Sequence, residues 1–238
     1  MLELVLAFAG LAVLTFAPGP LVRAAGIARL RRMSRGTLVL TYDDGPNSPA
    51  PTPQILDLLA QRKARATFFL VGECAAASPE LCRRMAEEGH DLGAHGYRHR
   101  HGWLDPLRAI ADVSAGIRAV APYRRGRPIY RQAYGKSTLW TLLAGARAGA
   151  LPVWWTLDSC DSREVLPELD LVLERVEREQ GGVVLMHDYL REATSPGARF
   201  TLELTARLLD LAARNGWKVR TASELLAESA PQPLEGSV

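Results

Sequence analysis

The chain has 238 residues, of which 47% are apolar and 23% are charged, and its formal net charge is +3. This composition predicts a globular protein with a buried core, in one large domain or two small ones. The small net charge, without a dense basic run, argues against nucleic acid as a partner. Cys74, Cys82 and Cys160 make neither a disulfide framework nor a zinc-ligand spacing. A Cys74–Cys82 pair and three free thiols both remain open.

Residues 1–22 form an apolar segment whose only charge is Glu3. A membrane-spanning helix needs roughly 17–25 residues, so the segment is marginal unless the helix continues through its Pro-Gly-Pro sequence. No basic residue precedes the apolar run, whereas five arginines follow within residues 23–36. By the positive-inside rule, the chain is expected to associate with a membrane and to hold its domain in the cytoplasm. A helix packed on the domain or lying in the membrane interface remains open, as does a cleaved signal peptide.

The rest of the chain divides into a basic linker over residues 23–36, a folded domain over 37–227 and a disordered tail over 228–238. Short apolar runs alternate with amphipathic stretches along the domain. The expected strands are Thr37–Tyr42, Ala66–Val71, Asp91–Ala94, Pro128–Arg131, Pro152–Leu157, Val183–Met186 and Trp217–Val219. The expected helices are Thr52–Arg62, Pro79–Glu88, Pro106–Val120, Ser137–Ala148, Glu168–Gln180 and Thr201–Arg214. This alternation predicts an α/β fold with about seven parallel strands, in a closed or nearly closed barrel.

Two adjacent carboxylates, Asp43 and Asp44, follow the first predicted strand and precede a Gly-Pro turn. A strand that ends this way delivers both acids to the carboxyl edge of the sheet, where α/β proteins build their active sites. Neighbouring carboxylates repel each other unless a cation or a proton lies between them. A metal ion held by one acid, with the other free as a base, resolves this conflict. The alternative interpretation is a solvated Asp-Asp-Gly turn.

His95 and His99 stand four residues apart after the third predicted strand. If these residues form a helical turn, both imidazoles lie on one face and are able to hold one metal ion. Together with Asp44 they would make a two-histidine, one-carboxylate set that leaves coordination positions open. His90, ahead of the strand, is expected to have a structural role, and His101 is expected in an exposed loop.

Five motifs occur in the order of those of the polysaccharide deacetylases, carbohydrate esterase family four, over about residues 37 to 220. They are Thr41–Pro46, His95-x-x-x-His99, Arg131–Gly135, Asp158–Asp161 and Leu185–His187. The chain resembles this family, and the resemblance implies a deformed (β/α) barrel that removes N-acyl groups from amino sugars.

The resemblance also implies a role for each matching residue. Asp43 would be the general base and His187 the general acid. The metal ligands would be Asp44, His95 and His99. Arg131 would orient Asp43 with the aid of Asp161. Asp158 would support His187. The backbone N–H of Tyr134 would stabilise the oxyanion. Taken singly, Arg131 fits a surface cation, Asp158 and Asp161 a loop pair, and His187 a buried structural histidine.

The chain departs from the family pattern at Gly96, Ala133 and Ser162, where the family usually has Ser or Thr, Pro and Trp. These departures remove no ligand or proton-transfer group, but they reshape the groove. The expected cofactor is a divalent metal ion: zinc first, with cobalt, nickel or manganese also compatible. The expected substrate is an N-acetylated or N-formylated amino sugar in a glycan or on a lipid. An outward-facing peptidoglycan or exopolysaccharide deacetylase and a non-catalytic carbohydrate-binding relative remain open. The sequence does not indicate an oligomeric state.

Overall fold

A single sheet of parallel strands forms the centre of the domain in the computed structural model, which describes residues 1–49, 51–188 and 195–228. Its strand order is β5-β4-β3-β2-β1-β7-β6, and β8 pairs with the start of β1. The strands are β1 (Thr37–Asp43), β2 (Thr67–Leu70), β3 (Asp91–Ala94), β4 (Ile129–Tyr130), β5 (Leu151–Pro152), β6 (Leu157–Asp158), β7 (Gly181–His187) and β8 (Lys218–Val219). The predicted α/β class and deformed barrel are confirmed.

The strand predicted over Pro152–Leu157 is wrong, because this segment carries the chain from one edge of the sheet to the other. The backbone N–H of Val153 donates to Tyr130 on β4, whereas that of Thr156 donates to Val183 on β7. The backbone changes hydrogen-bond partners within four residues, so no continuous strand forms. The segment bridges the gap between the two edge strands and completes the barrel wall.

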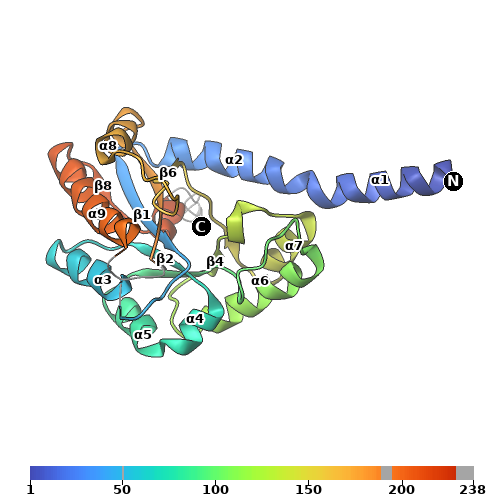
Figure 1. Cartoon of the computed structure of the whole chain (residues 1–238), viewed down its shortest axis with the longest axis horizontal. Helices are drawn as coiled ribbons and strands as arrows, with labels where there is room; N and C mark the ends of the chain where they lie inside the picture. The colour runs from blue at the N-terminus through green and yellow to red at the C-terminus, as the bar shows by residue number, and fades with distance from the viewer. Residues whose placement is uncertain (50, 189–194, 229–238) are drawn as a thin grey trace, which may run out of the picture.

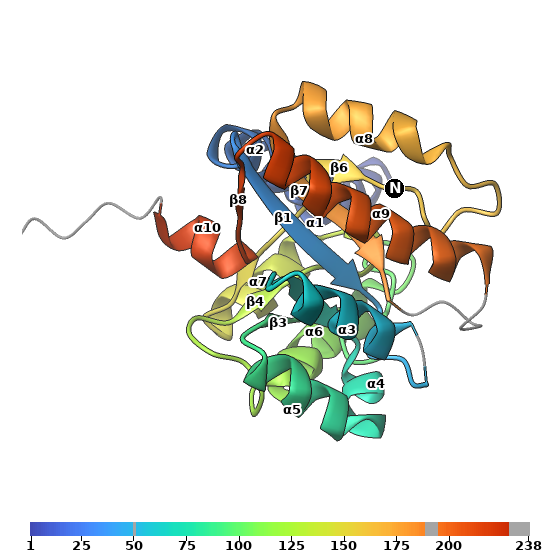
Figure 2. The same ribbon diagram turned by 90° about the vertical axis from the view of Figure 1, so that its left-hand side faces the viewer.

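Helices surround the sheet, as Figure 1 and Figure 2 show. Those of the domain are α3 (Thr52–Gln61), α4 (Gly72–Ala77), α5 (Pro79–Glu87), α6 (Pro106–Val120), α7 (Leu139–Arg147), α8 (Leu169–Arg178), α9 (Pro196–Arg214) and α10 (Ala222–Glu228), with a 3-10 turn η1 over Ala133–Gly135. Each of the six predicted helices is present, and α9 begins five residues earlier than predicted. The short helices α4 and α10 were not predicted, because six or seven residues are too few for a clear periodicity.

The alternation of side chains along β1 determines which of them reach the interior of the barrel. Leu38, Leu40 and Tyr42 belong to the apolar cluster that packs under α3 and α9. Val39 points the other way, into a second cluster that contains Phe69. Asp43 is four residues after Val39 and lies on the same face of β1, so its carboxylate points into the barrel.

The N-terminal helices α1 (Leu2–Phe16) and α2 (Pro18–Met33) form a nearly continuous rod that extends away from the domain (Figure 1). The segment predicted as a basic linker, residues 23–36, is helical up to Met33. Leu30 is buried in the interior cluster beside Val39 and Trp154, so α2 is packed on the barrel. None of the residues of α1 is buried.

The run Leu2–Met33 is long and apolar enough to cross a membrane by length and composition, a description that a signal sequence near an N-terminus also fits. Glu228, the first residue of the predicted tail, ends α10, and residues 229–238 lie outside the described residues.

Candidate active site

The strand register brings the predicted site residues to one end of the barrel. Asp43 on β1 pairs with His187 on β7, directly across two neighbouring parallel strands. His95 and Arg131 each follow the last residue of a strand, and those last residues, Ala94 and Tyr130, are also paired. Because parallel strands present their carboxyl ends at the same edge, residues far apart in the sequence meet there.

Asp43 and Arg131 form a buried ion pair at this edge. Nη1 of Arg131 donates to Oδ1 of Asp43 at 2.8 Å and to Oγ1 of Thr41 at 2.8 Å. Burial raises the pKa of Asp43 above its ordinary value, although the charges of Arg131 and His187 oppose this shift. The carboxylate is therefore held in one orientation and has more proton affinity than an exposed aspartate.

The guanidinium of Arg131 is fixed from every side. Nε and Nη2 donate to the carbonyls of Val153 and Trp154, and the group lies 4.1 Å from the centroid of the Phe69 ring. Only 1% of Arg131 is exposed, so the interpretation of this residue as a surface cation is wrong.

Asp44, His95 and His99 lie together beside this pair, with one potential ligand atom of each within 4.8 Å of the others. Oδ1 of Asp44 is 3.4 Å from Nε2 of His95 and 3.2 Å from Nε2 of His99. That oxygen is buried and accepts no hydrogen bond from the described residues. An orphaned carboxylate oxygen facing two imidazole nitrogens fits a bound divalent cation.

The tautomer of His95 follows from its other nitrogen. Nδ1 lies 2.9 Å from the carbonyl oxygen of Arg131, which only accepts, so Nδ1 carries the proton. Nε2 then presents a lone pair to Asp44 and to Oδ2 of Asp43, which is 3.6 Å away. Burial lowers the pKa of His95 to about 3. A neutral imidazole with its lone pair directed at carboxylates is suited to a metal ligand.

The helical turn expected for His95 and His99 is wrong, since residues 95–100 form a loop. Gly96 and His99 both adopt left-handed backbone angles, with φ of 79° and 54°. The carboxylate of Asp112 on α6 holds this loop, because its two oxygens accept from the backbone N–H groups of Arg98 and Arg100. A Cβ at position 96 would lie 2.3 Å from Oδ2 of Asp112, so only glycine fits beside this anchor.

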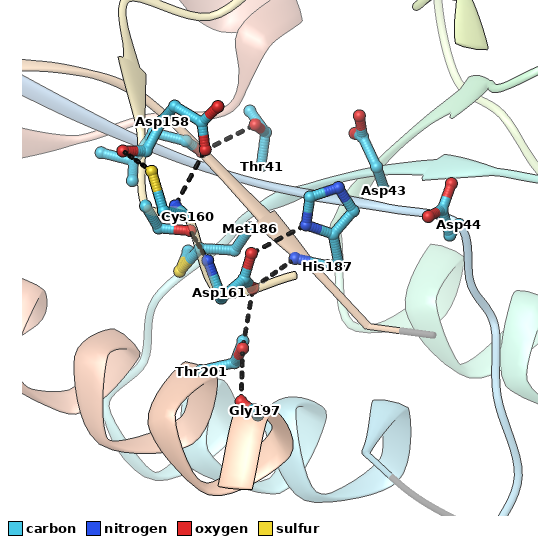
Figure 3. A network of polar contacts seen from close by, with 12 residues as sticks. Thr41, Asp43, Asp44, Asp158, Cys160, Asp161, Met186, His187, Gly197 and Thr201 are labelled. Atoms are coloured by element: carbon cyan, nitrogen blue, oxygen red, sulfur yellow. Dashed lines mark hydrogen bonds and ion pairs between the residues drawn. The ribbon is translucent and has the colours of Figure 1, made fainter. Parts of the chain in front are cut away.

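His187 is held by Asp161, not by Asp158 as the resemblance implied. Nδ1 of His187 lies 2.8 Å from Oδ1 of Asp161, and the backbone N–H of His187 donates to Oδ2 at 2.8 Å. Thr201 on α9 donates to the same Oδ2. Figure 3 shows the imidazole with Asp161 on one side and the carboxylates of Asp43 and Asp44 beyond the other. Asp161 thus contacts His187 and Thr201. Its assistance to Arg131 stays a prediction.

Burial by itself disfavours a charge on the His187 imidazole. The hydrogen bond and the negative charge of Asp161, together with the charges of Asp43 and Asp44, outweigh this effect and raise the pKa of His187 to about 9. At neutral pH the ring is therefore an imidazolium in contact with a carboxylate.

Asp158 has a local role in the loop that follows β6. Its Oδ1 accepts from the backbone N–H of Cys160, which has a left-handed φ of 60°. This turn directs the side chain of Asp161 toward β7 and leaves Asp158 at the wall of the cavity. The distinction between the two aspartates depends on this turn, which no spacing in the sequence reveals.

Asp43, Asp44, His95, His99, Asp158 and His187 line a cavity of about 480 Å³, and Arg131 and Asp161 hold these residues from behind its wall. Its walls also include Tyr134, Lys136, Trp155 and Ser162. Tyr134 has a left-handed φ of 57° and is 56% exposed, and its ring centroid lies 4.4 Å from that of His99. The role of its backbone N–H stays a prediction.

The remaining histidines lie outside the cluster. Nδ1 of the buried His90 accepts from the backbone N–H of Ala66, consistent with a structural role. His101 lies in a loop at the cavity wall, and its Nδ1 accepts from the backbone N–H groups of Trp103 and Leu104.

Sequence reasoning missed two buried aspartates that hold the site together. Asp112 had a detectable signal, because a carboxylate interrupts the buried face of the amphipathic helix α6. Asp188 accepts from the backbone N–H of Gly45 and from the hydroxyl of Thr52, and so fixes the loop after Asp44. Burial raises the pKa of Asp188 to about 7. It is adjacent to His187 in the sequence, but nothing there shows that it contacts a different loop.

Comparison with known proteins gives a family match. A family model described as polysaccharide deacetylase matches residues 31–150. A chitooligosaccharide deacetylase from Sinorhizobium fredii is 35% identical over 158 residues, which are 64% of this chain and 72% of that protein. A peptidoglycan-N-acetylglucosamine deacetylase from Bacillus cereus is 28% identical over 192 residues, 79% of this chain and 87% of that protein.

Solved structures agree with this match. A family 4 carbohydrate esterase from Streptomyces lividans, in complex with acetate, is 29% identical and has a TM-score of 0.65 over 79% of this chain and 92% of that one. A pseudoenzyme of the same family from Bacillus anthracis is 23% identical and has a TM-score of 0.67 over 81% of this chain and 66% of that one, a likeness of fold alone.

Proposed function

The chain belongs to the polysaccharide deacetylase family, and from this premise we propose that it is a metal-dependent hydrolase. It cleaves the carbon–nitrogen bond of an N-acyl group, acetyl or formyl, on an amino sugar. One observation carries the proposal: a carboxylate paired with a buried arginine, a cluster of three potential metal ligands and a histidine paired with an aspartate meet at the same cavity. Binding a sugar requires neither a base nor an acid.

A divalent cation held by Asp44, His95 and His99 would polarise the acyl carbonyl and acidify a water molecule. The ligand set of two imidazoles and one carboxylate suits zinc and is also compatible with cobalt, nickel or manganese. The chain presents these ligands preformed, because Arg131 orients His95 and Asp112 holds the loop of His99.

Asp43 is the general base. Its Oδ1 is engaged by Arg131, which leaves Oδ2 directed toward the three potential metal ligands, 3.6 Å from Nε2 of His95. The raised pKa of Asp43 helps it to take a proton from water, while Arg131 prevents the side chain from turning away.

His187 is the general acid. An amine is a poor leaving group unless it receives a proton, and an imidazolium with a pKa of about 9 is charged at neutral pH. Asp161 holds Nδ1, so Nε2 is the nitrogen that faces the cavity with the proton to donate.

Negative charge that develops on the acyl oxygen needs a donor within the cavity wall. The backbone N–H of Tyr134 supplies it, from a residue held at a positive φ beside His99. Strained backbone of this kind is often found where a functional group must be presented.

The substrate is an N-acylated amino sugar, in keeping with the activities in the names of the relatives. Ser162 lines the cavity where family members usually carry a tryptophan, which gives a more open wall. This opening favours a short or lipid-linked glycan over a long chitin-like polymer gripped along its length.

The N-terminal segment tethers the enzyme to a membrane. Because the arginines follow the apolar run, the domain is cytoplasmic. Alkaline phosphatase fused after Val238 tests this orientation, since that reporter folds only outside the cytoplasm. Active phosphatase would instead support an outward-facing deacetylase of peptidoglycan or exopolysaccharide.

The decisive experiment loads the full-length protein with zinc, cobalt, nickel or manganese and offers N-acetylated and N-formylated sugars, both soluble and lipid-linked. Mass spectrometry should detect loss of the acyl group and a new free amine. If metal-loaded protein bound these sugars but released no acyl group, it would be a non-catalytic carbohydrate-binding relative.

A further inference from the structure

Exposed apolar side chains gather where α1 meets the domain. Beyond residue 22, the large hydrophobic side chains that the structure describes as exposed are Trp103, Leu104, Leu107, Tyr134, Trp140, Val165 and Leu171. The first five, which we call the apolar rim, come from the start of α6, the start of α7 and the loops before these helices. Leu104 and Leu107 are 83% and 81% exposed. A cluster of this kind on a soluble surface marks an interaction site.

The apolar rim is continuous with the N-terminal helix. The ring of Phe16 lies 6.5 Å from that of Trp103, and the indole N–H of Trp140 donates to Oγ1 of Thr15. Residues 1–14 are all exposed, so the apolar part of α1 leaves the domain at the rim, beside α7 in Figure 1. A membrane that receives α1 therefore lies next to the rim.

The composition of the rim matches the interfacial layer of a bilayer. Tryptophan and tyrosine are enriched there because their rings are apolar and their N–H or O–H groups remain hydrated. Nζ of Lys136 lies 4.7 Å from the centroid of the Trp103 ring, and Arg108 projects from α6 beside Leu107. Both cations are suited to anionic headgroups.

The apolar rim also borders the catalytic cavity. Tyr134 and Lys136 line that cavity, and the ring of Tyr134 contacts those of His99 and His101 in tilted arrangements. Trp103 is fixed to the same loop, because its indole N–H donates to the carbonyl of Ser137. A surface that covers the rim thus lies at the mouth of the cavity.

We propose that the apolar rim lies in the headgroup layer of a lipid bilayer, so that the cavity opens at the membrane surface and receives an amino sugar carried there on a lipid. The contact with the bilayer goes beyond the tether formed by α1. The lipid-borne substrate rests on the deacetylase function proposed above.

Lipid contact is measured without reference to activity. The full-length chain is placed in nanodiscs whose acyl chains carry bromine near the headgroup, and tryptophan emission is recorded. Trp103→Phe and Trp140→Phe should each remove a quenched component of the emission, whereas Trp217→Phe should leave the quenched component intact. If both rim variants are quenched like the unchanged protein, the rim does not contact lipid and the proposal is wrong.

The substrate class is measured with the double variant Leu104→Ser/Leu107→Ser. Its turnover of a dialkyl N-acetylglucosaminide in vesicles should fall on the order of tenfold, because two apolar contacts with the interface are lost. Its turnover of soluble chitooligosaccharide should stay unchanged. The matched control is Val165→Ser/Leu171→Ser, which alters two exposed apolar residues away from the rim, 83% and 57% exposed, and should retain both activities.

Equal losses on both substrates would overturn the lipid-borne substrate class. If the protein were a dimer whose rim is not quenched by lipid, and if Leu104→Ser/Leu107→Ser converted it to monomers, a second copy would cover the rim. That outcome would overturn the membrane contact. Absence of acyl release from every substrate would refute the proposed function but would leave the quenching result to decide the membrane contact.

Discussion

Nδ1 of His187 and Oδ1 of Asp161 lie 2.8 Å apart, in a contact between the end of β7 and the loop after β6. The same carboxylate accepts from the backbone N–H of His187 and from Thr201. Three donors converge on one buried acid, which fixes both the orientation and the proton of the imidazole. This arrangement leads to the first prediction.

Asp161→Asn should lower the pKa of His187, because the charge that stabilises the imidazolium is removed. In the native protein the pKa of His187 is raised from 6.5 to about 9. The imidazolium, which is the acid form, is therefore present below about pH 9 and is lost above it. The variant should lose the acid form at lower pH, and kcat should fall about 100-fold. The ring is titrated by NMR in metal-free protein. Asp158→Asn is the control and should leave this titration unchanged.

His187→Ala should separate proton transfer from metal binding. Turnover should fall about 10²- to 10⁴-fold, which is the usual contribution of a general acid to the rate. The amount of bound metal should stay at the native level. His95→Ala should lose the metal itself, because one of three ligands is gone. Elemental analysis after dialysis distinguishes the two variants. Equal metal loss in both would mean that His187 is a ligand and not the acid.

Asp43→Asn should abolish turnover and preserve both the metal and the fold. The amide oxygen still accepts from Arg131, so the buried guanidinium keeps a partner, but an amide does not take a proton from water. Metal content and thermal unfolding serve as controls. A variant with normal kcat would remove Asp43 from the role of base.

Asp112→Asn should weaken metal binding without touching a ligand. An asparagine has one acceptor oxygen in place of two, so one of the backbone N–H groups of Arg98 and Arg100 loses its partner and the loop of His99 loosens. We expect metal affinity to fall about 10- to 100-fold, as for other residues that orient ligands. Competition with a chromogenic chelator measures this. Asp57→Asn, at an exposed carboxylate on α3, should bind metal normally.

Asp188→Asn should stabilise the metal-free protein above neutral pH. The native carboxyl has a pKa raised from 3.8 to about 7, so its contribution to stability is fully present below its ordinary pKa and is lost as the pH rises through 7. Asparagine carries no charge at any pH, and its amide is able to accept from Gly45 and to donate to Thr52. Denaturant unfolding in detergent between pH 5 and pH 9 should show a shallower loss of stability in the variant. An unchanged pH dependence would contradict this account.

The sequence by itself determined where the candidate site residues lie along the chain. Asp43, His95, Arg131 and His187 each end or follow a predicted strand, and parallel strands bring such residues to one edge whatever the loops do. The class of fold followed from the alternation of strands and helices, since two periodicities of hydrophobic residues distinguish them.

Only the tertiary structure decided which aspartate holds His187, because Asp158 and Asp161 are three residues apart and a single left-handed turn at Cys160 separates their directions. It also placed α2 on the barrel, where burial of Leu30 against residues distant in sequence outweighs the linker-like composition of this segment. Contacts distant in the sequence also divide the predicted fifth strand, because the backbone N–H groups of Val153 and Thr156 donate hydrogen bonds to different strands. Local patterns specify which element a residue belongs to, whereas contacts across the sheet specify its partners.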